Sequence, residues 1–211
     1  MSEIIGWLQI YYQEIIGTIL SLVYLYLSII QNKWLWPLGL VSSAMYTYIF
    51  LKAGIYADMG LQIYYVIISV YGWFVWIDMQ KEKKNSSATV KSLSKLKLLP
   101  IWLLIFTSIV FIVLSQILVH FTDSTVPYID AFTTALSITA TWMLARKIIE
   151  HWILWIVVDL VSSGVYYVKG LYVTIFLYIV YTIFAVVGYL FWLKSYRIYR
   201  DGISQNNSLA F

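Results

Sequence analysis

Long apolar stretches follow one another along almost the whole chain, with only short polar breaks between them. A transmembrane helix needs about 20 mainly apolar residues. Seven stretches of this kind can be placed, at residues 12–30, 34–51, 56–77, 100–119, 129–145, 149–168 and 171–193. Charged residues make up only 11% of the chain, against roughly 25% in soluble domains. The sequence therefore predicts an all-α integral membrane protein with seven transmembrane helices and a lipid bilayer as its surroundings.

Basic residues are unevenly divided between the two ends of these helices. One end collects Lys33, Lys81, Lys83, Lys84, Lys91, Lys95, Lys97, Arg146, Lys147, Lys194, Arg197 and Arg200. The other end holds only Lys52 and Lys169. Because basic residues in short loops resist translocation, we expect the N-terminus outside the cell and the C-terminus in the cytoplasm. The net charge of +4 is thus a membrane-edge signal, and no nucleic-acid partner is expected.

Other features of the sequence disfavour an enzyme. There is no cysteine, and hence no disulfide, thiolate metal site or cysteine nucleophile. No GxxxxGK[ST] phosphate-binding loop occurs, and residues 171–193 contain no lysine for the Schiff base of a light receptor. His120 and His151 fall at different predicted helix ends, and we interpret both as interfacial. Residues 1–13 hold Glu3 and no basic residue, so we expect no cleaved signal peptide. We expect no catalytic residue, metal or cofactor.

The two halves of the chain match at a fixed offset. At 116 residues the matched pairs are Gly54/Gly170, Tyr56/Tyr172, Leu61/Leu177, Tyr65/Tyr181, Gly72/Gly188, Trp76/Trp192, Glu14/Asp130, Thr18/Thr134 and Ser21/Ser137. The Val-Ser-Ser sequence at 41–43 recurs at 161–163, an offset of 120 that predicts a four-residue gap between the second and third helices. Because four crossings separate corresponding positions, the two units enter the membrane in the same direction. Such parallel repeats are typical of transporters that bind substrate near the midplane between them.

This pattern divides the chain into five regions. We expect a first three-helix repeat at residues 1–77 and a second at 120–193, joined by a linking transmembrane helix at 100–119. Residues 78–99 carry six lysines among Asn and Ser and are interpreted as a flexible cytoplasmic linker. Residues 194–211 form a cytoplasmic tail.

Asp159 stands near the middle of the sixth predicted helix. A carboxylate facing lipid there costs at least about 2.5–3.5 kcal/mol on insertion scales, so it is expected to face protein, water or a ligand. Trp152 and Trp155 precede it at a spacing that places all three on one helix face, which Tyr166 continues. Indole faces stack on flat rings and attract cations, so this face favours a flat, cationic solute. The alternatives are an interfacial anchor for Trp152 and a structural hydrogen bond for Asp159.

Polar side chains on the second and third predicted helices could read hydroxyl groups of a substrate. Gln62 lies on the third helix, with Asp58 at its outer end, and Ser42 and Ser43 lie on the second. Small residues also let helices approach closely in lipid, and packing is the simpler interpretation for Ser42, Ser43, Ser162, Ser163 and Gly164. Aromatic pairs near helix ends, Trp34/Trp36 and Tyr189/Trp192, are interpreted as interfacial anchors.

Three segments carry a family resemblance. They are Ile55-Tyr56-Ala57-Asp58 through Leu61-Gln62, Tyr71-Gly72-Trp73-Phe74-Val75-Trp76, and Trp152-Ile153-Leu154-Trp155. With these motifs the chain resembles the PnuC family of vitamin transporters over nearly its whole length. The sequence departs from nicotinamide riboside members at Asp159, where an Asn is common, and at Ser69, where some carry Asn.

The resemblance implies a fold similar to the SWEET sugar transporters, assembled as a homotrimer in the bacterial inner membrane. It implies facilitated uptake of nicotinamide riboside, a precursor of NAD, with trapping inside by phosphorylation. Trp152 and Trp155 would then stack on the substrate ring, and Gln62 would help to hold it. An added carboxylate suits the pyridinium of nicotinamide riboside and the thiazolium of thiamine, and neutral riboflavin less well. A thiamine transporter and a membrane receptor without transport remain the alternatives.

Overall fold

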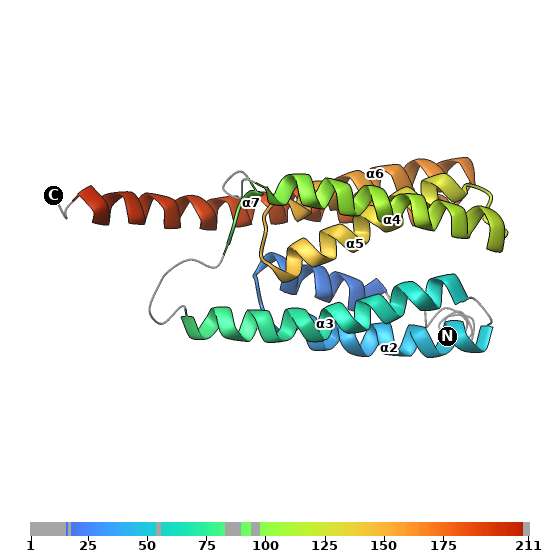
Figure 1. Cartoon of the computed structure of the whole chain (residues 1–211), viewed down its shortest axis with the longest axis horizontal. Coiled ribbons are helices and arrows are strands. Elements are labelled where there is room, and N and C mark those ends of the chain that lie inside the picture. Colours follow the sequence, from blue (N-terminus) through green and yellow to red (C-terminus); the bar gives the residue numbers. More distant parts are fainter. Residues whose placement is uncertain (1–15, 17, 54–55, 83–89, 94–97, 209–211) are drawn as a thin grey trace, which may run out of the picture.

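The computed structural model describes residue 16 and residues 18–53, 56–82, 90–93 and 98–208, and these form a helical bundle (Figure 1). Its helices are α2 (Leu35–Ala53), α3 (Tyr56–Glu82), α4 (Leu99–Phe121), α5 (Pro127–Ala145), α6 (His151–Val168) and α7 (Tyr172–Ser208), preceded by a helix at Thr18–Ile29. The all-α class and the seven predicted helices are therefore observed in the described part of the chain. Glu14, Gly54, Lys83, Lys84, Lys95, Lys97 and the side chain of Asp58 lie outside the described residues.

In the part of the chain that the structure describes, four helical segments are long and apolar enough to cross a membrane. They are Met59–Gln80, Leu99–Phe121, His151–Val168 and Thr174–Ile198. The helices α2 and α5 each have 19 residues, or about 28 Å at 1.5 Å per residue, but carry more polar side chains. In α5 the hydroxyls of Ser137, Thr139 and Thr141 are buried and bond to carbonyls one turn back, at 2.7–3.0 Å. These groups avoid lipid because α5 packs inside the protein.

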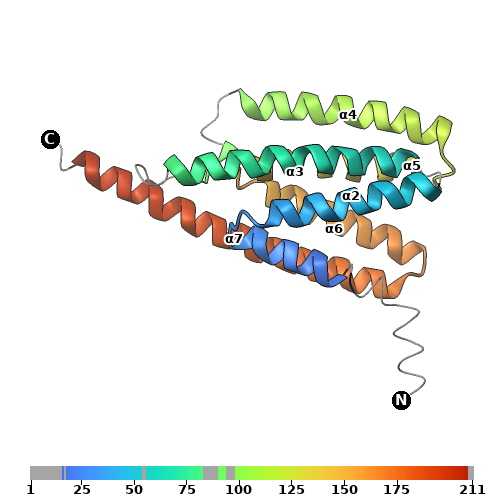
Figure 2. The same cartoon turned by 90° about the horizontal axis from the view of Figure 1, so that it is seen from below.

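The centre of the bundle is α5, which packs against α3, α4 and α6. The paired helices α2 and α3 lie on one side of it, as Figure 1 shows, and α6 pairs with α7. The helix α4 packs mainly on α5, through a 2.7 Å bond between the Thr107 and Thr139 hydroxyls. Figure 2 shows α4 at the edge of the bundle, where most of its large apolar side chains are exposed. We call the end of the bundle near residues 30–35 and 145–151 the linker end, and the opposite one the far end.

The turns that leave Thr18–Ile29 and α5 have the same backbone. Gln31 and Lys147, which are 116 residues apart, both take left-handed φ angles, 56° and 55°. Each turn then repeats the same bonds: the Gln31 amide donates to the Ser28 carbonyl at 3.1 Å, and the Lys147 amide to the Leu144 carbonyl at 2.9 Å. A left-handed residue just past the last turn is a common way to end a helix. Both turns thus stop one helix and start the next at matching places.

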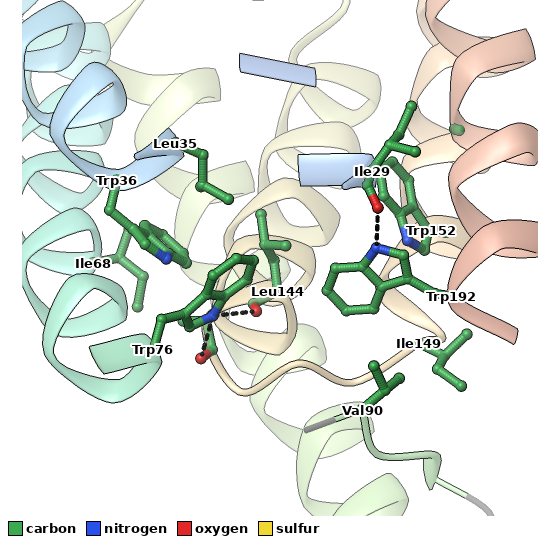
Figure 3. Close-up of a cluster of buried hydrophobic side chains, with 12 residues drawn as sticks. Ile29, Leu35, Trp36, Ile68, Trp76, Val90, Leu144, Ile149, Trp152 and Trp192 are labelled. Atoms are coloured by element: carbon green, nitrogen blue, oxygen red, sulfur yellow. Dashed lines mark hydrogen bonds between the residues drawn. The ribbon is translucent and has the colours of Figure 1, made fainter. Parts of the chain in front are cut away.

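Four tryptophans, Trp36, Trp76, Trp152 and Trp192, are buried at the linker end, and we call them the tryptophan cluster (Figure 3). Trp76 Nε1 donates to the Leu144 and Ala145 carbonyls at 3.3 and 3.2 Å. Trp192 Nε1 donates to the Ser28 and Ile29 carbonyls, both at 3.1 Å. The last carbonyls of a helix have no partner within it. The third helix of each half, α3 or α7, therefore provides hydrogen-bond donors for the final turn of the first helix of the other half.

Two glycines make room for the remaining indoles of the cluster. A Cβ atom on Gly72 would lie closer than 3.0 Å to the Trp36 indole, and one on Gly188 equally close to that of Trp152. Since these contacts match at 116 residues, α2 and α6 are aligned at that offset. The predicted offset of 120 with a four-residue gap is wrong, because it paired identical letters and not equivalent contacts.

Several aromatic predictions also need correction. Trp36 and Trp192 are 1% and 0% exposed, so they pack inside the protein and are not interfacial anchors. Trp34, in contrast, is 60% exposed and stacks obliquely on Trp73 with ring centroids 5.6 Å apart. Nearness to a helix end, which is all that the sequence showed, does not tell which way a side chain faces.

The linker is shorter and more ordered at one point than the sequence suggested. The helix α3 continues to Glu82, so residues 78–82 are helical. Lys91 pairs with the turn before α6: its amide donates to the Lys147 carbonyl, and the Ile149 amide donates to the Lys91 carbonyl, both at 2.9 Å. Val90 is buried beside Ile149 (Figure 3). We call residues 90–93 the strap; this part of the linker is docked and not a free loop.

Candidate functional site

Asp159 lies on α6, two turns from its start at the linker end, and only 6% of its surface is exposed. Among the described residues no hydrogen bond to its carboxylate is found; the nearby Ser163 hydroxyl donates to its backbone carbonyl instead, at 2.8 Å. The carboxylate therefore lies inside the protein, as expected. A buried carboxylate without an ion pair is costly unless a proton or a cation neutralises it.

Three tyrosines line the neighbourhood of this carboxylate. Tyr178 and Tyr181, both on α7, lie close enough to interact electrostatically with Asp159. Tyr166, on the same helix as Asp159, packs against Tyr178 with ring centroids 5.2 Å apart. The structure thus joins Asp159 and Tyr166 through a side chain that the sequence did not single out.

The far side of this group reaches the first half of the chain. The Tyr181 hydroxyl lies 2.6 Å from the Ser21 hydroxyl, on the helix Thr18–Ile29. Ser137 and Tyr65, the corresponding pair at an offset of 116, also lie close enough to interact. The 116-residue match pairs Ser21 with Ser137 and Tyr65 with Tyr181. Nothing in the sequence indicated that a Ser of one half contacts a Tyr of the other.

The two tryptophans of the predicted site lie in different surroundings. Trp152 is 1% exposed, covers Gly188 and meets Trp192 edge to face at 5.9 Å. Its Nε1 has no hydrogen-bond partner among the described residues. Trp155 is only partly buried and packs on the edge of the core. Of the two indoles, Trp155 is the more accessible to a ligand.

The sequence predicted an interfacial position for His151, but this prediction is wrong because the side chain is fully buried. Its ring lies 4.6 Å from Trp152 and 4.7 Å from Trp192, between centroids. Its Nδ1 donates to the Ile148 carbonyl at 2.7 Å, while Nε2 has no partner in the described part of the chain. His120, at the other predicted helix end, is exposed.

The predicted residues of the third helix lie away from this group. Gln62 is partly buried on α3, and Ser69 is 5% exposed, with its Oγ 3.2 Å from the place a Cβ of Gly39 would take. Both α3 and α6 pack on α5. Gln62 and Ser69 belong to the first half of the bundle, whereas Asp159 on α6 belongs to the second.

This arrangement of side chains has the chemistry of a binding site. A carboxylate, phenol hydroxyls and an accessible indole together suit a flat cation. No group of three His, Cys, Asp or Glu residues that could hold a metal ion is found among the described residues.

Comparison with known proteins adds a family. The sequence matches the family model described as nicotinamide mononucleotide transporter over residues 11–194. The nicotinamide riboside transporter PnuC of Escherichia coli is 25% identical over 207 residues, covering 87% of this chain and 86% of that protein. The riboflavin/roseoflavin transporter RibM of Streptomyces davaonensis is also 25% identical, over 196 residues, covering 90% of this chain and 88% of the relative.

A solved structure shares the fold. The crystal structure of the vitamin B3 transporter PnuC matches this chain with a TM-score of 0.70 at 19% sequence identity. The match covers 94% of this chain and 87% of the other. The arrangement of helices is therefore the same in outline.

Proposed function

The chain belongs to the nicotinamide mononucleotide transporter family, which the PnuC proteins represent, and from that premise we propose that it carries nicotinamide riboside into a bacterial cell. Membership makes the chain a multi-pass membrane protein that transports a vitamin, and not an enzyme. The choice of nicotinamide riboside goes further, because the relatives include a riboflavin transporter at the same identity.

The observation that supports this choice is the buried carboxylate of Asp159. Nicotinamide riboside carries a permanent positive charge on its pyridinium ring. A carboxylate that lacks a partner among the described residues would be neutralised by that ring, whereas neutral riboflavin would leave it uncompensated. Thiamine, also a cation, is the second candidate for the same reason.

We assign the substrate contacts accordingly. Asp159 supplies charge, Trp155 stacks on the ring, and Tyr166 closes the face of α6. Gln62, across the bundle on α3, binds hydroxyl groups of the substrate. Trp152, which is buried in helix packing, supports the face of α6 from behind, and Ser69 lies with Gln62 on α3.

The proposal includes the setting of the transporter. Two parallel three-helix repeats, joined by α4, would rock against each other around the site, in a homotrimer in the bacterial inner membrane. The linker end, which holds Lys33, Arg146 and Lys147, would face the cytoplasm. Uptake would be facilitated, and phosphorylation inside would trap the product. Tagging the two chain ends and labelling them from outside intact cells tests the orientation.

Isothermal titration calorimetry of the purified protein with nicotinamide riboside, thiamine and riboflavin tests the substrate. We expect saturable binding of nicotinamide riboside. Trp155→Ala should weaken its Kd about tenfold, equivalent to about 1.4 kcal/mol. Trp102→Ala, which removes an indole that is 64% exposed on α4, is the matched control and should leave Kd unchanged.

Each other result has a definite meaning. Binding of thiamine alone would make the chain a thiamine transporter with the same site. Binding of riboflavin alone would remove the charge argument, and a Trp102→Ala effect equal to that of Trp155→Ala would show that the site has been misplaced.

A further inference from the structure

Two cationic side chains at the linker end lie against aromatic rings. Arg146, just past the end of α5, donates from Nη1 to the Tyr71 hydroxyl at 2.8 Å, and its Cζ lies 5.6 Å from the centre of the Trp142 ring. Lys33 Nζ lies 5.8 Å from the centre of the Trp73 ring. Among the described residues, neither cation is paired with a carboxylate. The aromatic contacts thus position both positive charges and leave them available to an anion.

The exposed face of α3 lies between these two cations. Three large apolar side chains form an exposed stripe along it: Ile67, Val70 and Phe74. Successive residues of an α-helix are rotated by about 100°, which places Tyr71 on one side of this stripe and Trp73 on the other. Because Arg146 contacts Tyr71 and Lys33 contacts Trp73, the two cations flank the stripe.

The depth of the stripe matches the boundary between headgroups and acyl chains. Phe74 lies six residues before the end of the apolar segment Met59–Gln80, which is about 9 Å along the helix. The headgroup region of a bilayer is about 5–8 Å thick on each side. The stripe therefore meets acyl chains, whereas the turns that carry Lys33 and Arg146 lie at the level of the headgroup phosphates.

The geometry points to a binding site for an anionic phospholipid, whose headgroup pairs with Lys33 and Arg146 and whose acyl chains lie along the stripe of α3. Guanidinium and ammonium groups both donate charge-assisted hydrogen bonds to phosphate oxygens. Asp78 is exposed on the same face, but the two cations outnumber it. In the orientation proposed above, the lipid belongs to the cytoplasmic leaflet, where anionic lipids attract basic residues.

Native mass spectrometry of the full-length protein in detergent tests this, with phosphatidylglycerol as the anionic probe and phosphatidylcholine as the neutral one. The unaltered protein should retain phosphatidylglycerol at a concentration at which it loses phosphatidylcholine. Lys33→Gln and Arg146→Gln should each weaken phosphatidylglycerol binding about fivefold, and the double variant about twentyfold. Arg146→Lys, which keeps the charge, should retain most of the binding.

Lys52→Gln is the matched control, because Lys52 also lies over an aromatic ring, 5.6 Å from the centre of Tyr48, but at the far end of α2. It should leave phosphatidylglycerol binding unchanged. Thermal unfolding in detergent without added lipid should be the same for this control and for the two single variants, which separates lost binding from lost folding.

Four results would overturn the inference. They are equal retention of both lipids by the unaltered protein, unchanged phosphatidylglycerol binding in the double variant, displacement of the lipid by inorganic phosphate, and a change in the number of associated chains in the variants. Displacement by phosphate would mean that the cations bind the free anion, and a changed number of chains would make this face a subunit contact. Because no vitamin is added in these experiments, each of these results would leave the proposed function standing.

Discussion

The two halves of the bundle share one set of packing contacts but differ in chemistry. In the first half Trp36 covers Gly72, and in the second Trp152 covers Gly188. In each half an indole N–H also donates hydrogen bonds to carbonyls in the last turn of the first helix of the other half. The bundle is thus held together at the linker end by the same contact made twice.

The halves differ further along α2 and α6, from about one turn beyond Trp36 and Trp152. At the offset of 116, Trp155 corresponds to Gly39 and Asp159 to Ser43. In the first half the glycine admits Tyr24, whose ring would lie 3.1 Å from a Cβ at that position. In the second half an indole and a carboxylate one turn apart occupy the same places. The comparison teaches that the packing is duplicated, whereas the candidate site is not.

Removing the shared indoles should have the largest effect. Trp76→Ala and Trp192→Ala should each lower the free energy of unfolding by about 3–5 kcal/mol, the usual cost of deleting a buried large aromatic side chain. Each change also leaves buried carbonyls without a donor. Thermal unfolding in detergent measures the loss, with Trp102→Ala as the control. A large loss for one indole and none for the other would break the equivalence of the halves.

Filling the glycine positions should have an intermediate effect. Gly72→Ala and Gly188→Ala put a Cβ into Trp36 and Trp152, and such overpacking costs about 1–3 kcal/mol. Gly60 and Gly164 have no neighbour within 4 Å of a Cβ, so alanine there should be neutral or stabilising. Unfolding measurements on all four variants decide the matter, and equal effects at Gly164 and Gly188 would contradict the packing described.

Releasing the strap should have the smallest effect and appear in one half only. The Glu150 carboxylate accepts from the Ser92 hydroxyl at 2.6 Å and from the Leu93 amide at 3.0 Å. Glu150→Ala should lower the free energy needed to open the strap by about 1 kcal/mol. This is less than the full strength of charged hydrogen bonds, because the Glu150 carboxylate is partly exposed and screened by solvent. Hydrogen exchange at the Leu93 amide should then be about fivefold faster.

The matched change in the first half is Trp34→Ala, since Trp34 corresponds to Glu150 at 116 residues. It should leave exchange at Leu93 unchanged. Faster exchange in both variants would mean that the strap responds to general loosening of the linker end and is not held by Glu150.

Hydropathy was enough to predict the helices, because lipid demands long apolar segments whatever they pack against. It could not tell which of two aromatic residues near a helix end is buried, as Trp34 and Trp36 show. The strap was missed because its bonds use backbone groups and a Glu that looks like an ordinary surface residue. The burial of Asp159 was predictable from its depth in an apolar helix, whereas its tyrosine neighbours on α7 depend on how α6 and α7 pack.

The crossed indole bonds also bear on how the chain is made. The carbonyls of Ser28 and Ile29 belong to a helix that is synthesised before α2, yet their donor is Trp192 in α7. Until α7 has entered the membrane, the first helix has an unsatisfied end inside the protein. The final turn of the helix Thr18–Ile29 is therefore completed only by α7, six helices later, and this contact closes the bundle only after α2 to α7 have been made.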